Sequence, residues 1–152
     1  MRIHEILTES KVPVLYHGSY KEFPLGFVLT PQSDGYQHST SDVRHTEEII
    51  ESYRPSDMMS RFDSVFMVDD ATDIDNAGGY DDYVYVVEPI GNVERNNLGW
   101  YSDVAVYGEY DNDNHEDIEQ WSLNYWHGHD AVNGVWEYRA RSARIVKVLY
   151  TS

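Results

Sequence analysis

The chain has 152 residues, of which 41% are hydrophobic, and this size suits one domain with its own core. It contains no cysteine, which excludes disulfide scaffolds, thiolate zinc sites, iron–sulfur clusters and cysteine nucleophiles. There are 27 acidic residues against 11 Lys and Arg, and the formal charge of −16 disfavours nucleic acid, anionic membranes and unfocused phosphate ligands as partners.

The chain is predicted to form one unit that does not cross a membrane. No apolar run approaches the ~20 residues that span a bilayer, and residues 1–10 lack the apolar core of a signal peptide. No repeat or linker divides the sequence, so residues 12–152 are expected to form a single domain behind an N-terminal preamble, residues 1–11. The apolar residues of this preamble suit a short helix, and we expect a cytoplasmic protein.

The first half of the domain is predicted to contain three strands and two helices. Residues 12–19 are rich in β-branched and aromatic side chains and end in a Gly-Ser turn, which indicates a strand with His17 at its end. The short apolar run 27–29 is a second candidate strand, and Ser64–Val68 is predicted to be a buried one. A capped helix is expected from Val43 to Tyr53, and a shorter one within residues 69–79.

The second half begins with the clearest strand, Tyr83–Val87, which Glu88 and Pro89 are expected to end. Residues 98–114 are ambiguous, whereas residues 116–126 have the apolar spacing of an amphipathic helix. Two strands, Val135–Arg139 and Arg144–Tyr150, are predicted to follow, about five residues apart. Short strands with a few brief helices indicate the α+β class.

Neither of two candidate metal sites meets the requirements of its class. The acidic stretch Asp111–Glu119 alternates carboxylates as a calcium loop does, but it lacks Gly at the sixth position and Glu at the twelfth. His127 and His129 have no third ligand at a suggestive spacing. We therefore predict no metal, and we interpret the acidic residues of 69–88 and 109–119 as solvated connecting regions.

One compact hydrogen-bonding edge stands out near the N-terminus of the domain. The usual phosphate-loop, dinucleotide-fold and serine-hydrolase motifs are absent from the chain. In the run 15–19, however, His17 precedes Gly18, whose bare backbone can approach a ligand, and the hydroxyl of Ser19. Such a turn is also common as a purely structural feature, so its meaning depends on the segments that follow.

Those segments complete a pattern in chain order. After HGSYKEFPLG at residue 17 come SVFMVDDATDIDNAG, VYVVEPIGNVERNNL and VWEYRARSARIVKV, starting at residues 64, 84 and 135. With them the chain resembles, from Leu15 to Leu149, the ADP-ribosyltransferase superfamily. It is similar in particular to the small rifamycin-inactivating ADP-ribosyltransferases and to the diphtheria-toxin-like group that includes poly-ADP-ribose polymerases. The resemblance implies two small packed antiparallel sheets with short peripheral helices, and NAD bound between the sheets as co-substrate.

The signature of that superfamily is a His, a Tyr and a Glu, one from each of three strands. By this resemblance His17 binds a ribose 2′-hydroxyl, and the Gly18 backbone, next to Ser19, receives the nicotinamide amide. The aromatic position matches Phe66, which retains the stacking surface but lacks the hydroxyl. The acid matches Glu137, whose carboxylate would stabilise an oxocarbenium-like transition state.

Two assignments stay open within the resemblance. In the rifamycin-modifying enzymes the acid instead follows the VEP-x-G segment, where Asn96 stands at the matching place and Glu94 lies close to it. The acid is therefore Glu137, which we favour, or Glu94. Tyr80, just past the predicted short helix, is either a second aromatic that stacks on nicotinamide or an ordinary core residue. Several bases are expected near the cleft, where they would tolerate a pyrophosphate: Lys21, Arg139, Arg141, Arg144 and Lys147.

The leading hypothesis is a mono-ADP-ribosyltransferase that transfers ADP-ribose from NAD to a protein or small-molecule acceptor. Nucleic acid is disfavoured as the acceptor because the acidic protein repels it. RNA 2′-phosphotransfer is a weaker enzymatic alternative, because that family depends on several Arg residues around its site. The alternative from another class is a non-catalytic acidic interaction protein, of DNA-mimic or phage-inhibitor type, possible also on a degenerate transferase fold. The opening MRIHEIL is similar to starts common in phage-encoded proteins, which suggests a bacterial or phage-infected host cytoplasm.

Overall fold

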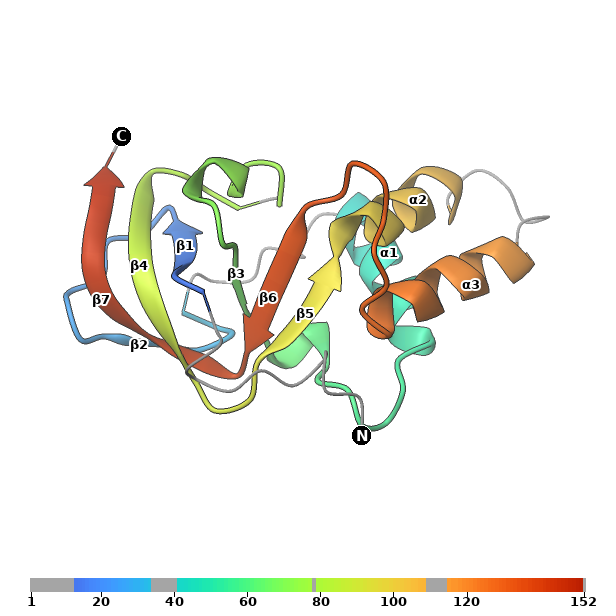
Figure 1. Ribbon diagram of the computed structural model, residues 1–152, viewed down its shortest axis with the longest axis horizontal. Helices are drawn as coiled ribbons and strands as arrows, with labels where there is room; N and C mark the ends of the chain where they lie inside the picture. Colours follow the sequence, from blue (N-terminus) through green and yellow to red (C-terminus); the bar gives the residue numbers. More distant parts are fainter. Residues whose placement is uncertain (1–12, 34–40, 78, 109–114, 152) are drawn as a thin grey trace.

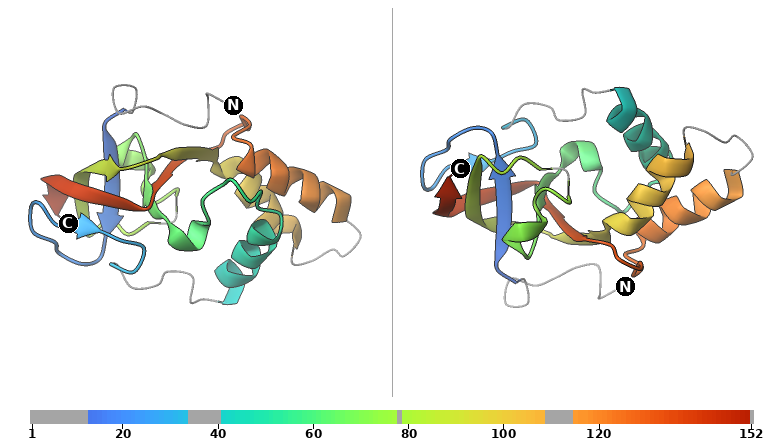
Figure 2. Two further views of the ribbon diagram at one scale, coloured as in Figure 1. Left: turned by 90° about the horizontal axis from the view of Figure 1, so that it is seen from below. Right: turned by 90° about the horizontal axis from the view of Figure 1, so that it is seen from above.

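The computed structural model describes residues 13–33, 41–77, 79–108 and 115–151. Two antiparallel sheets lie next to each other, and the three α-helices lie beyond the second sheet, on the side away from the first (Figure 1). The two views of Figure 2 show the same sequence of layers, with the second sheet in the middle. The predicted α+β class with two antiparallel sheets is therefore confirmed.

The first sheet has four strands in the order β1-β4-β7-β2. The strands are β1 (Leu15–Ser19), β2 (Val28–Leu29), β4 (Tyr83–Ile90) and β7 (Ser142–Thr151). In the β1–β4 pairing His17 lies opposite Tyr85, and Gly18 lies opposite Val84. Strand β1 therefore forms one edge of this sheet, so that one of its sides is available to the second sheet.

The second sheet has three strands in the order β3-β6-β5. They are β3 (Val65–Met67), β5 (Glu94–Asn97) and β6 (Trp136–Ala140). In the register of β6, Arg139 lies opposite both Phe66 and Glu94, and Glu137 lies opposite Asn96. The sheets are joined by a β-bridge between Tyr16 and Val68, with both backbone hydrogen bonds formed, at 2.8 and 3.0 Å.

The helices are α1 (Ser41–Ser52), α2 (Leu98–Gly108) and α3 (His115–Trp126), with two short 3₁₀ helices, η4 (Arg61–Asp63) and η5 (Ala71–Asp73). Ser60 caps η4 by accepting from the Phe62 amide, and Asp70 caps η5 by accepting from the Thr72 amide. The indole of Trp126 in α3 donates to the Ile50 carbonyl of α1 at 2.7 Å. Side chains of the three helices form one apolar cluster.

Apolar side chains from both sheets form the main core. Because side chains alternate along a strand, the second sheet contributes Val65, Met67, Tyr138 and Ala140 to this core. The residues between them, Phe66, Glu137 and Arg139, face the helical side instead. Polar and charged groups are thereby placed in the layer between the second sheet and the helices.

Most predicted elements are present, with differences at some of their limits. Strand β4 continues past Glu88 to Ile90. Pro89, which has no backbone N–H to donate, is accommodated in the strand opposite Ala143. The ambiguous residues 98–108 are helical in α2. Strands β6 and β7 are separated by Arg141 alone rather than by about five residues, because the chain passes directly from one sheet to the other. The predicted preamble, residues 1–11, lies outside the described residues, and so does part of the acidic stretch, at residues 111–114.

Strand β5 is an element that sequence patterns do not predict. Its residues are Glu-Arg-Asn-Asn, and Asn is a poor strand former. It forms because its side chains bind elsewhere: Asn96 accepts from the Arg139 guanidinium at 2.8 Å and donates to the Tyr125 carbonyl at 2.7 Å. In the described parts of the chain, no helix combines the length and the apolar character that a membrane crossing requires.

Candidate functional site

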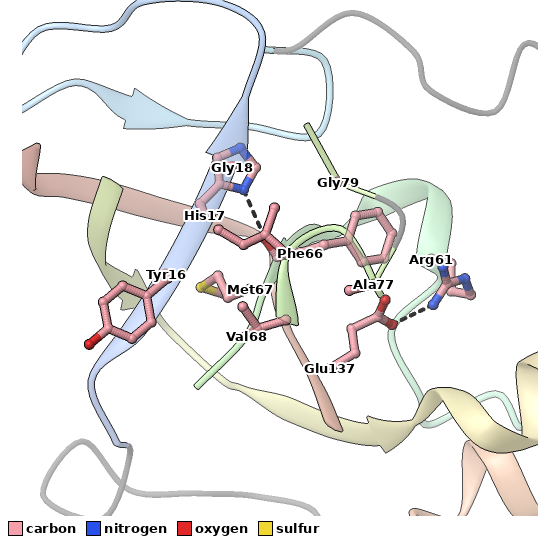
Figure 3. Close-up of a pocket in the computed structure, with 11 residues that line it drawn as sticks. Tyr16, His17, Gly18, Arg61, Phe66, Met67, Val68, Ala77, Gly79 and Glu137 are labelled. Carbon is pink, nitrogen blue, oxygen red and sulfur yellow. Dashed lines mark hydrogen bonds and ion pairs between the residues drawn. The ribbon is translucent and has the colours of Figure 1, made fainter. Parts of the chain in front are cut away.

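A pocket lies where β1 of the first sheet meets β3 of the second (Figure 3). Its walls come from β1 (Tyr16, His17, Gly18), from β3 and the residue after it (Phe66, Met67, Val68), from the segment after η5 (Ile74, Ala77, Gly79), and from η4 and β6 (Arg61, Glu137). Four residues selected from the sequence, His17, Gly18, Phe66 and Glu137, therefore lie around one cavity although they belong to three strands.

His17 is fixed in the pocket wall by the neighbouring sheet. The residue is 7% exposed, and Nδ1 lies 2.8 Å from the carbonyl oxygen of Phe66. A carbonyl oxygen only accepts, so Nδ1 carries the proton and donates this bond. In this tautomer Nε2 is the ring nitrogen with acceptor character.

Gly18 allows the segment after η5 to close one side of the pocket. A Cβ atom at this position would overlap the carbonyl oxygen of Tyr80 and would stand 2.5 Å from Cγ2 of Ile74. The backbone of residues 79–80 can approach β1 only because there is no side chain here. Gly18 thus allows a close approach, and in this structure the group that approaches it is the backbone of the segment after η5.

Phe66 supplies an aromatic wall with a cation beside it. Its ring lines the pocket, and the centre of the ring is 4.7 Å from Cζ of Arg61. The same guanidinium lies 4.8 Å from the Tyr101 ring and 5.5 Å from the Tyr125 ring. Because each ring face is electron-rich, the three aromatic faces around the guanidinium stabilise its positive charge.

Glu137 has two carboxylate oxygens in different surroundings. The residue is 2% exposed and lines the pocket. Oε1 accepts from Nη1 of Arg61 at 2.5 Å and from the hydroxyl of Tyr125 at 3.0 Å. Among the described residues, Oε2 has no hydrogen-bond donor. Figure 3 shows the carboxylate between Arg61 on one side and Ala77 and Phe66 on the other.

Arg61 is the site residue that the sequence does not reveal. It is 5% exposed and binds a second carboxylate, Glu47 of α1, through Nε at 2.8 Å and Nη2 at 3.0 Å. Burial is the largest single influence and lowers the pKa of Arg61, but Glu137, Glu47 and Tyr125 together outweigh it, so the pKa ends well above its ordinary value. In the sequence Arg61 stands in a polar segment, and no pattern distinguishes it from the more exposed Arg44 and Arg54.

Tyr125 and Tyr101 complete the hydrogen bonding of the two acids. Burial raises the pKa of Tyr125 most strongly, Arg61 lowers it by less than burial raises it, and the negative charge of Glu137 raises it further. Burial and Glu47 raise the pKa of Tyr101, which donates to Glu47 Oε1 at 3.1 Å. Both phenols therefore keep their protons at neutral pH and act as donors to the carboxylates.

Three other candidates from the sequence lie outside the pocket lining. The hydroxyl of Ser19 accepts from the backbone amide of Lys21 at 2.9 Å. Tyr80 is 48% exposed, and its ring packs edge-on against Tyr20 with centroids 5.2 Å apart. Glu94 accepts from Arg139 at 2.9 Å and from the Met59 amide. Of the two candidate acids, only Glu137 borders the cavity.

The expected basic residues also lie elsewhere. Arg139 is fully buried but directed at Glu94, Asn96 and the Met59 carbonyl, and it is not part of the pocket wall. The ammonium of Lys21 lies 3.4 Å from the Ser33 carbonyl. The cation that borders the pocket is Arg61. None of the five expected bases is part of the pocket wall, although Nε of Arg139 lies 4.0 Å from Oε1 of Glu137, which borders the pocket.

The chain was compared with protein-family models, with curated proteins and with solved structures, and none of the three comparisons finds a match. In the described part of the chain no three His, Asp or Glu side chains come together as a metal site would require, and the rings of His127 and His129 are 6.2 Å apart.

Proposed function

We propose that the protein is a mono-ADP-ribosyltransferase with an ADP-ribosyltransferase-like fold, which transfers ADP-ribose from NAD to a protein or small-molecule acceptor. The observation that carries this proposal is the meeting of His17, Gly18, Phe66 and Glu137 around one pocket at the seam of two antiparallel sheets. These residues were selected by order and motif alone, so their convergence is independent support.

The pocket residues fit the chemical groups of NAD. His17 would bind a ribose hydroxyl, and its ring is oriented by the hydrogen bond between Nδ1 and the Phe66 carbonyl. The ring of Phe66 offers an apolar face to nicotinamide. Gly18 presents a backbone without a side chain to the same cavity. An apolar wall with a few convergent polar groups is the usual composition of a small-molecule site.

NAD, when bound, supplies an ADP-ribosyl group on a pyridinium leaving group. Glu137 would stabilise the positive charge that develops at the anomeric carbon while the carbon–nitrogen bond breaks and its electron pair leaves with nicotinamide. Its Oε2 is the suitable atom, because Oε1 is already engaged by Arg61 and Tyr125. The acceptor nucleophile then forms the new bond at that carbon and loses its proton.

A second candidate function has one observation in its favour. Arg61 balances the charge of Glu137 inside the pocket, and Phe66 has no hydroxyl. Both features suit a transferase fold that serves as a non-catalytic binder. Such a protein, with a formal charge of −16, would bind basic proteins in a salt-sensitive way.

The test is nicotinamide release from labelled NAD by the wild type and by three variants, His17→Ala, Glu137→Gln and Glu94→Gln. Wild-type protein is expected to release nicotinamide, and Glu137→Gln to do so about 10² to 10³ times more slowly, which is the usual effect of removing one group that stabilises transition-state charge. His17→Ala is expected to weaken NAD binding as well. Selective loss in Glu94→Gln would move the acid to that residue.

A wild-type protein that neither binds NAD in a thermal-shift assay nor releases nicotinamide would exclude the transferase. Salt-sensitive binding to a basic protein, in the same preparation and without any NAD effect, would then establish the non-catalytic binder.

A further inference from the structure

The two oxygens of the Glu137 carboxylate differ in their hydrogen bonding. Its hydrogen bonds with the described residues are all accepted by Oε1, from Nη1 of Arg61 and from the hydroxyl of Tyr125. Nε of Arg139 lies 4.0 Å from the same oxygen. A carboxylate and a guanidinium that meet freely tend to pair through both oxygens. Here the pairing is one-sided, so something restrains the guanidinium of Arg61.

Glu47 provides that restraint. Its two oxygens take Nε and Nη2 of Arg61 at 2.8 and 3.0 Å, so the two-pronged contact is made with Glu47 and only Nη1 remains for Glu137. The side chain of Glu47 is fully buried, and Tyr101 donates to its Oε1 at 3.1 Å. Glu47 belongs to α1 and does not border the pocket. Among the contacts described, Arg61 is the pocket-lining residue that Glu47 binds.

The aromatic rings limit the guanidinium further. Phe66, Tyr101 and Tyr125 surround it, with ring centres 4.7, 4.8 and 5.5 Å from Cζ. If the contact with Glu47 is removed, Glu137 becomes the sole carboxylate partner of a buried charge. The guanidinium would then rotate to bind both oxygens of Glu137, and this would withdraw Oε2 from the pocket.

We propose that Glu47 is a positioning residue for the ADP-ribosyl transfer, which acts through Arg61 to keep Oε2 of Glu137 directed into the pocket. This inference rests on the proposed function. It gives the helical layer a part in the reaction, although neither α1 nor α3 contributes a residue to the pocket wall.

The experiment compares Glu47→Gln with the wild type in steady-state nicotinamide release. We expect kcat to fall about 10- to 100-fold, the usual consequence of misplacing a reacting group, with KM for NAD unchanged. The fraction of competent protein is counted by calorimetric binding of an NAD analogue in which carbon replaces the ribose ring oxygen, so that it is bound but not cleaved. Unchanged stoichiometry separates a positioning effect from partial unfolding.

Two milder variants cover the case in which Glu47→Gln does not fold. Tyr125→Phe removes one donor to Glu137 Oε1 and is expected to lower kcat several-fold with KM unchanged. Tyr138→Phe is the matched control, because its phenol also bonds a carboxylate, Asp69 at 3.1 Å, but stands outside the pocket wall. We expect its kcat and KM to equal those of the wild type.

Three results would overturn the inference. The first is a folded Glu47→Gln variant with wild-type kcat, and the second is a loss that appears in KM or in binding stoichiometry alone. The third, for use when Glu47→Gln does not fold, is a Tyr125→Phe variant with the kinetics of Tyr138→Phe. A wild type without NAD turnover would instead remove the proposed function itself, and the inference with it.

Discussion

Two buried arginines lie on the helical side of the second sheet, and their partners differ in kind. The hydrogen-bond partners of Arg139 are all internal to the fold, namely the Met59 carbonyl, Ser64, Asn96 and Glu94, and Glu137 lies farther away, with its Oε1 4.0 Å from Nε. Arg61 is bound by two carboxylates, one of which borders a pocket. The first arginine closes a polar network, and the second connects such a network to a cavity.

This difference shows how one residue type closes a network inside the fold in one place and borders a cavity in another. A buried charge is tolerated when its hydrogen bonds are satisfied, and both guanidinium groups meet that condition. Only at Arg61 does a partner keep an oxygen, Oε2 of Glu137, without a donor among the described residues. A functional site is expected where such satisfaction is incomplete and the incomplete atom faces a cavity.

The largest expected effect is a loss of stability on replacing Arg139, whose hydrogen-bond partners are internal to the fold. Arg139→Met leaves Glu94 and Asn96 without their cationic partner, and it should lower the free energy of unfolding by about 3–5 kcal/mol. Urea denaturation followed by circular dichroism measures this. Adding Glu94→Leu to the same chain should restore part of the loss, because the unpaired carboxylate is then gone. A double variant no more stable than Arg139→Met would show that the pair does not account for the cost.

A smaller loss of stability is expected from a substitution in the pocket wall. Gly18→Ala places a methyl group against the Tyr80 carbonyl and Ile74, and the resulting shift of backbone should cost about 1–3 kcal/mol of stability. It should also abolish the thermal shift produced by NAD. Gly108→Ala is the control, because its added methyl group meets the flexible Cδ1 end of Ile49 at 3.1 Å. Retention of the NAD effect in folded Gly18→Ala would separate Gly18 from the site.

The smallest effect is at an exposed carboxylate that no arginine pairs with in the described structure. The side-chain and backbone hydrogen bonds of Thr72 lower the pKa of Asp70 at the cap of η5, just before the pocket wall of residues 74–79. Thr72→Val should raise that pKa toward its ordinary value, as followed by carboxyl NMR titration. Asp103, whose pKa is raised by burial, should titrate as before.

The sign of the linked stability change follows from the lowered pKa. The folded state holds Asp70 ionised, so the cap contributes stability above the aspartate pKa of the unfolded chain and loses it as the pH falls through the folded value. Thr72→Val should therefore reduce stability at neutral pH and leave it unchanged in strong acid. An equal loss at both pH values would assign the effect to packing instead.

The sequence allowed the prediction of those elements whose pattern is local. Residues 15–19 and 83–87 alternate in a way that specifies a strand, and residues 116–126 carry a helical spacing. Strand β5 was missed because Asn96 is buried by bonds to Arg139 and to the Tyr125 backbone, which are distant in the chain. No local pattern records partners of that kind.

The residues of the candidate site also differ in whether local sequence patterns predict them. His17, Phe66 and Glu137 were found because they sit in motifs whose order resembles that of a known superfamily, and the structure brings them to one cavity. Arg61 was missed because nothing near it in the sequence marks it as buried. Its location depends on Glu47 and on a strand near the C-terminus, so only the folded chain reveals it.

The spacing of the charges along the chain has a consequence for the order of assembly during synthesis. Glu47 is 14 residues from Arg61, whereas Glu137 is 76 residues away. The shorter loop costs less entropy to close, and a ribosome delivers the N-terminal side first. The nascent chain can therefore neutralise Arg61 with Glu47 long before β6 exists. When Glu137 is synthesised later, it would bind a guanidinium that Glu47 already orients.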